Sequence, residues 1–82
     1  MARGKSRTDR WREAAAAAVA ALEQLREVQE EYQEWLDNLP EGLDQSAVAD
    51  KLNEVCDLDV EGALDTCNEA ENVDLPLGFG RD

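Results

Sequence analysis

A heptad repeat of apolar residues in the first half of the chain is the feature that most constrains the fold. One row of the repeat contains Ala15, Leu22 and Leu36, with Gln29 completing its series. The second row contains Trp11, Ala18, Leu25, Tyr32 and Leu39, and the flanking apolar positions are Ala14, Ala21, Val28 and Trp35. Four heptads in register predict one amphipathic helix from about 9 to 38, roughly 45 Å long, with Thr8 or Asp9 as its N-cap.

The second half of the chain predicts two shorter helices. Pro40 and Gly42 end the first helix, because proline cannot continue the hydrogen-bond ladder and glycine allows a turn. The second helix is expected to begin at an N-cap of Asp44 or Ser46 and to end at about residue 56. The third helix is expected to begin at an N-cap of Asp57 or Asp59 and to end at about residue 71. The residues expected to face inward are Ala47 or Val48, Leu52 and Val55, and then Val60, Ala63, Leu64 and Cys67. With no alternating strand pattern, we expect an all-α chain: a flexible basic head over 1–8 and a single acidic helical domain over 9–82, irregular from 73 onward.

The charge of the chain is large and unevenly distributed. It has 20 acidic and 8 basic residues, a formal charge of −12. Residues 1–12 hold five basic residues and one acid, whereas residues 13–82 hold three basic residues and 19 acids. An acidic surface of this kind keeps a small protein soluble, or suits a strongly positive partner such as a nucleic-acid-binding protein. The basic head either solubilises the chain and pairs with its own acids, or contacts nucleic acid.

Five acids recur at helical spacing on the first helix and form the candidate partner-binding surface. They are Glu23, Glu27, Glu30, Glu34 and Asp37. Spacings of 4, 3, 4 and 3 place them on one side of the helix over about 21 Å, and their mutual repulsion costs about 1–2 kcal/mol. One carboxylate per about 4–5 Å is a diluted version of the 3.4 Å phosphate spacing of a DNA strand. Tyr32 belongs to the second row of the heptad repeat and is expected to be a core residue. Trp35 is expected either to act as an aromatic anchor for the partner or to cover the core.

The alanine-rich part of the helix is the candidate self-association surface. The residues assigned to it are Ala14, Ala15, Ala18, Leu22 and Leu25. Small side chains let a second helix approach closely, which favours a homodimer with coiled-coil packing. Within the heptad repeat, Gln29 is expected either to form a polar contact that sets the register of the paired helices, or to mark the point where the apolar rows stop being buried.

The sequence contains little that would support catalysis or metal binding. The chain has no histidine, so it lacks the commonest general base and metal ligand, and we expect no enzyme, cofactor or metal. Residues 57–62 resemble the start of a calcium loop, but its twelfth position is Asn68 rather than a bidentate glutamate, which favours helix capping. Cys56 and Cys67 are expected to be small core residues rather than a disulfide. No apolar run is long enough to span a membrane, and no signal sequence is evident, so a cytoplasmic protein is expected.

Three segments carry a resemblance to a known group of proteins. The runs EYQEWLDNLPEGL at 31–43, ADKL at 49–52 and DLPLGFGRD at 74–82 resemble small uncharacterised acidic proteins of bacteriophages and prophages, over residues 22–82. The resemblance implies a phage origin and action in the host bacterial cytoplasm, and it brings no assigned activity. In size and acidity the chain is also similar to phage inhibitors of host defence, namely anti-CRISPR and DNA-mimic antirestriction proteins.

Two functional hypotheses follow. In the first, the chain is a phage-encoded inhibitor whose acidic helix occupies a basic nucleic-acid-binding surface of a host defence or nucleic-acid-handling protein. The acidic domain would then bind neither nucleic acid nor a membrane. In the second, it is a self-assembling helical structural or adaptor protein of the phage, without an inhibitory role.

Overall fold

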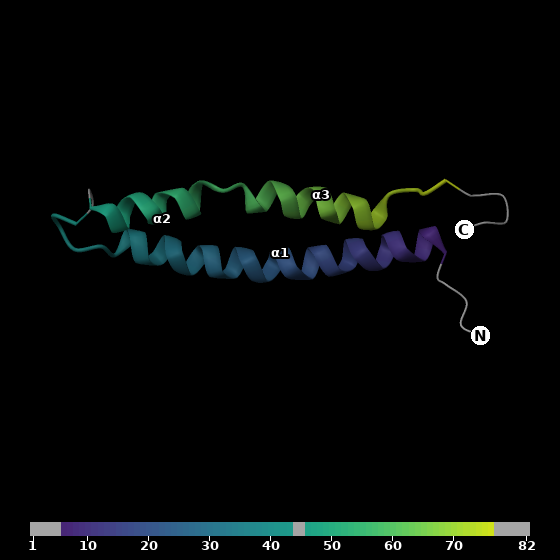
Figure 1. Cartoon of the computed structure of the whole chain (residues 1–82), viewed down its shortest axis with the longest axis horizontal. Helices are drawn as coiled ribbons and strands as arrows, with labels where there is room; N and C mark the ends of the chain where they lie inside the picture. Colours follow the sequence, from purple (N-terminus) through teal and green to yellow (C-terminus); the bar gives the residue numbers. More distant parts are fainter. Residues whose placement is uncertain (1–5, 44–45, 77–82) are drawn as a thin grey trace.

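The computed structural model describes residues 6–43 and 46–76, which form three helices and no strand. α1 spans Arg7–Asp37, α2 spans Ala47–Asp57 and α3 spans Val60–Asn72. α2 and α3 follow one another along α1 and run in the opposite direction, so the fold is a hairpin of one long helix and one interrupted helix (Figure 1). The all-α class is therefore confirmed, with one long N-terminal helix and two short ones.

α1 begins two residues earlier than the sequence predicted. The hydroxyl of Ser6 accepts a hydrogen bond from the backbone N–H of Asp9 at 3.0 Å, so Ser6 is the N-cap. The prediction of Thr8 or Asp9 as the cap was wrong, and both lie in the first turn, where the charge of Asp9 suits the helix dipole. The helix thus takes in Arg7 and Thr8 from the predicted flexible head, whose residues 1–5 lie outside the described part.

The end of α1 lies close to the predicted position. The backbone N–H of Asn38 donates to the carbonyl oxygen of Glu34 at 3.0 Å, and its side-chain amide donates to the same oxygen at 2.8 Å. Pro40 and Gly42 follow in the turn, and Gly42 has a φ of 92°, which favours glycine. These contacts satisfy the last turn of α1 and redirect the chain toward α2.

Side-chain oxygens cap both short helices. The Ser46 hydroxyl accepts from the N–H of Ala49 at 3.2 Å, and the Asp59 carboxylate accepts from the N–H of Gly62 at 2.9 Å. Of the predicted alternatives, Ser46 and Asp59 are therefore the caps, while Asp57 is the last residue of α2. Asp44 lies outside the described residues.

Gln29 of α1 bridges the interruption between α2 and α3. Its side-chain Nε2 donates to the carbonyl oxygens of Val55 at 2.9 Å and Leu58 at 2.8 Å. Carbonyls at the end of a helix have no partner within it, so this amide supplies donors where α2 ends. Of the two predicted roles for Gln29, the structure shows the register-setting polar contact.

Two side chains of α1 close the other end of the hairpin. The indole Nε1 of Trp11 donates to the carbonyl oxygen of Ala70 at 2.8 Å, and Nη1 of Arg12 donates to that of Glu71 at 3.3 Å. The last turn of α3 has no basic residue of its own, so Arg12 places a positive charge at the negative end of its dipole. The register of α1 against α2 and α3 is thus held at two separated points.

The buried core is small. Its members are Ala15, Ala49, Leu52, Val60 and Leu64. The inward positions of Leu52, Val60 and Leu64 were predicted correctly, and Val55 and Cys67 are half-buried. The inward placement of Ala47 or Val48, and of Ala63, was wrong: all three are exposed. In α2, Ala49 instead faces α1.

Much of the second heptad row remains at the surface. Trp11 is 46% exposed, Leu25 is 52% exposed and Tyr32 is 37% exposed, so the prediction that Tyr32 is a core residue was wrong. In the first row Ala15 is buried and Leu22 is half-buried. The physical reason is that one interrupted helix packs along α1 and covers one row, whereas the repeat offers two.

Candidate protein-binding surface

Five carboxylates of α1 form an exposed row that we call the acidic face. Its members are Glu23, Glu27, Glu30, Glu34 and Asp37, and all five are exposed. At about 100° per residue they fall within an arc of about 80°, and α1 is unbroken across them, so the row is about 21 Å long. The structure therefore brings the five predicted acids together on one side of one helix.

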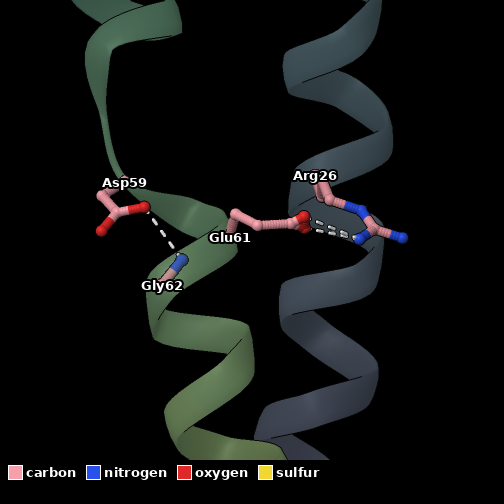
Figure 2. Close-up of polar contacts among 4 residues, drawn as sticks. All are labelled: Arg26, Asp59, Glu61 and Gly62. Atoms are coloured by element: carbon pink, nitrogen blue, oxygen red, sulfur yellow. Dashed lines mark hydrogen bonds and ion pairs between the residues drawn. The ribbon is translucent and has the colours of Figure 1, made fainter.

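Arg26 is the one basic residue of α1 within the length of the acidic face. Its Nη1 lies 2.8 Å and 3.2 Å from the two carboxylate oxygens of Glu61, the second residue of α3 (Figure 2). The hydrogen bond and the charge of Glu61 raise the pKa of the Arg26 guanidinium above its ordinary value. The charges of Glu30 and Glu23 add to this increase. Arg26 is thus shared between α3 and the acidic face, and Glu61 joins the negative side of the hairpin.

The negative charges of the other acids in the row are little neutralised by basic residues of the chain. Glu27 and Glu34 make no hydrogen bond or ion pair with any residue in 6–43 or 46–76 through their side chains. The carboxylate of Asp37 accepts a hydrogen bond from Gln33 at 2.9 Å, which leaves its charge in place. A cationic partner would therefore meet hydrated carboxylates and few internal ion pairs.

Trp35 is not part of the acidic face. Its side chain is 53% exposed, and its ring stacks on that of Tyr32, with centroids 6.1 Å apart and planes inclined by 19°. Its position is about 120° around α1 from the centre of the acidic row. Of the six residues predicted to bind a partner, the five acids lie together and Trp35 lies on another side of the helix.

The predicted self-association residues are divided between two environments. Ala15 is buried, and Ala18 and Leu22 are half-buried, in the part of α1 that packs along α3. Ala14 and Leu25 are exposed. The chain thus uses the middle of this set for its own packing and leaves the edge of the set at the surface.

Sequence reasoning missed an apolar hollow between α1 and α2. It has a volume of about 300 Å³, and its lining residues are Tyr32, Trp35, Val48, Lys51, Leu52 and Val55. The signal for it was the apolar flank formed by Val28 and Trp35, which makes the apolar surface of α1 wider than one partner helix covers.

The segment that resembles a calcium loop is occupied by other interactions. Asp59 caps α3, Glu61 pairs with Arg26, and Asp57 ends α2. A Cβ atom at Gly62 would collide with the capping carboxylate of Asp59, which explains the glycine at this position (Figure 2). Across the described residues, no three His, Cys, Asp or Glu side chains converge as metal ligands.

Two remaining features bear on the chemistry of the chain. The thiols of Cys56 and Cys67 are free and half-buried. Among the helices of the described part, none has the length and apolar character needed to cross a membrane.

Comparisons with known proteins found nothing similar. No protein-family model matches the sequence, and no curated protein or solved structure shows significant similarity to it.

Proposed function

We propose that this protein is a non-catalytic inhibitor whose acidic face occupies a basic, nucleic-acid-binding surface of another protein. The observation that carries the proposal is the row of five exposed carboxylates on an unbroken stretch of α1. Arg26, the basic residue of α1 beside this row, is already paired with Glu61 of α3. Opposite charge on a partner would be attracted to this side, and at long range it would speed their association.

The energetics also favour a binding role for the acidic face. Neighbouring acids at spacings of three and four repel one another, at a cost of a few tenths of a kcal/mol for each pair. A hairpin with five buried apolar residues has little stability to give up. A cationic partner would relieve this repulsion in the complex, because each carboxylate would gain a positive neighbour.

The expected target is a host defence protein that handles nucleic acid. A phage origin is part of this proposal, and an anti-CRISPR or DNA-mimic inhibitor would act in the host cytoplasm. A groove that binds a nucleic acid backbone has closely spaced Lys and Arg side chains, which the carboxylates of α1 would meet in place of phosphates.

The proposal is tested by reversing the charge of the acidic face. The immobilised protein is used to capture proteins from host lysate, and binding of the captured protein to labelled nucleic acid is titrated with free inhibitor. The variant Glu27→Lys/Glu30→Lys/Glu34→Lys should weaken inhibition at least about 100-fold, because three attractive contacts become repulsive. Inhibition by the parent protein should also weaken steeply with added salt.

A second triple variant controls for net charge. Glu41, Glu54 and Asp74 are exposed and do not belong to the acidic face; they lie on the turn, on α2 and after α3. Their replacement by lysine changes the net charge by the same amount and should alter inhibition by less than about threefold. Equal loss in both triple variants, or full inhibition by the acidic-face variant, would refute the proposal. So would capture of proteins that do not bind nucleic acid.

The alternative function, a self-assembling structural or adaptor protein, is favoured by a different observation. Large apolar side chains are exposed on another side of the hairpin, and exposed apolar patches mark interaction surfaces.

A further inference from the structure

The hairpin has an exposed apolar surface near its turn, which we call the apolar face. It consists of Leu25, Val28, Tyr32 and Trp35 on α1, Val48 on α2, and Leu58 between α2 and α3. Their exposed fractions range from 37% for Tyr32 to 65% for Leu58. Six large apolar residues exposed side by side form a patch of the size, on the order of several hundred Å², that marks interaction surfaces.

The apolar face is hollowed rather than flat. Tyr32 and Trp35 line the 300 Å³ hollow between α1 and α2. A second, smaller hollow of 60 Å³ lies beside it and shares Tyr32 and Val55 with it. Side chains of another helix layer would fill both hollows, as knobs fill the gaps between paired helices.

A hairpin of this kind has no second layer of its own. α2 and α3 lie one after the other along α1 in a single layer, and the shortest principal extent of the chain is 15 Å (Figure 1). Helical domains bury their apolar rows by stacking two layers, and two-helix hairpins reach this arrangement by pairing into four-helix bundles. The apolar face is the side on which such a layer is missing.

We propose that a second copy of this chain covers the apolar face, with the two-fold axis parallel to the helices. In this arrangement α1 of each copy packs over α2 of the other, and all neighbouring helices run antiparallel. A patch on the order of several hundred Å² from each copy, with the polar rim around it, approaches the roughly 1,200–2,000 Å² that stable interfaces bury in total.

The charges around the apolar face fit a second copy of the same chain. Lys51 of α2 borders the face at the hollow that contains Tyr32 and Trp35. Glu31 of α1 borders it on the opposite edge, beside the same two rings. Neither Lys51 nor Glu31 forms an ion pair with a described residue. The two-fold axis therefore brings Lys51 of each copy to Glu31 of the other, at the same height along the bundle.

The acidic face does not oppose this pairing. Its carboxylates lie on the side of α1 that carries Glu61 and Arg26, about 120° around the helix from Trp35. In the bundle the two acidic faces point outward, on opposite sides and beyond about one Debye length of each other. This inference is independent of the proposed function, because a dimer could form with or without a basic target.

The proposal is tested by sedimentation of the full chain between about 1 and 200 μM. The parent protein should be a dimer at the upper concentrations and dissociate on dilution. The variant Trp35→Ser/Leu58→Ser should raise the dimer dissociation constant at least about 100-fold, because each site occurs twice in a two-fold interface. Both side chains are more than half exposed, so the helices should persist, as far-UV circular dichroism will report.

Matched variants separate this face from general hydrophobicity. Leu43→Ser/Val73→Ser replaces two exposed apolar residues that line neither hollow of the apolar face, and it should leave the dissociation constant within about threefold of the parent. A parent protein that stays monomeric at 200 μM would overturn the proposal. A dimer that the Trp35/Leu58 variant does not weaken would also overturn it, because the interface would then lie elsewhere.

A charge swap tests the two-fold arrangement. Lys51→Glu and Glu31→Lys should each weaken the dimer about tenfold, since each creates two like-charge contacts. The double variant restores opposite charges at both contacts and should return the dissociation constant to within about threefold of the parent. Additive weakening in the double variant would refute this orientation of the two copies.

Discussion

Replacing the amide of Gln29 by a carboxylate should destabilise the hairpin, because the amide holds the point where α2 ends. In the parent, Nε2 donates to the carbonyl oxygens of Val55 and Leu58 at 2.9 Å and 2.8 Å. Gln29→Glu keeps the shape of the side chain but turns two donor contacts into contacts between negatively polarised oxygens. Each lost hydrogen bond costs about 0.5–1.5 kcal/mol, so the free energy of unfolding should fall by about 2 kcal/mol at pH 7.

The destabilisation should depend on pH. Two carbonyl oxygens disfavour the ionised form of the new carboxyl, so its pKa is raised in the folded state above the unfolded value of about 4.3. The folded variant then binds a proton more tightly than the unfolded chain. The deficit relative to the parent should therefore be smallest at pH 4 and should grow as the pH rises to 7.

The measurement is urea unfolding followed by far-UV circular dichroism, at one protein concentration and at both pH values. Gln24→Glu is the matched control, because Gln24 is exposed on the same helix and the chemical change is the same. The Gln24 variant should lie within about 0.5 kcal/mol of the parent. If both variants lose equal stability, or if the loss at Gln29 is the same at pH 4 and pH 7, the bridging role of Gln29 is refuted.

Three further predictions concern the helix ends and the thiols. Trp11→Phe keeps an aromatic ring but removes the donor to the end of α3, and it should lower the free energy of unfolding by about 1 kcal/mol in urea titrations. Gly62→Ala should leave the free energy of unfolding of the parent nearly unchanged, because the gain in helix propensity offsets the displaced Asp59 cap. In the Asp59→Ala variant, which has no cap to displace, the same change should raise the free energy of unfolding by about 1 kcal/mol. Equal effects in both backgrounds would contradict the capping geometry. Cys56 and Cys67 should both react with a thiol reagent in the native protein, giving two equivalents without prior reduction.

The helices of the fold were predictable because their signals are local. The heptad repeat located α1, and Pro40 and Gly42 marked its end. The start of α1 was predicted too late, although Ser6 with an acid three residues later is a recognisable N-terminal signal. A local pattern was sufficient to place a helix wherever residues close in the sequence form the hydrogen bonds of the backbone N–H and C=O groups.

The wrong predictions concern contacts between helices. A heptad repeat shows that a helix has two apolar rows, but it does not show how many helices cover them, so Tyr32 was placed in the core. The inward residue of the first turn of α2 was missed for the same reason, since Ala49 faces inward only through its placement against α1. The acidic face was predictable because repulsion and exposure depend on one helix alone.

The closure of the hairpin by Trp11 and Arg12 has a practical consequence for handling the molecule. The beginning of α1 and the end of α3 lie together at one end of the rod, and the turn between α1 and α2 lies at the other (Figure 1). Trp35 and Asp37 belong to the turn end. A fluorophore or surface tether attached at Ser6 or Pro76 would sit at the opposite end of the hairpin from these residues, so single-molecule and immobilised assays can use either attachment point.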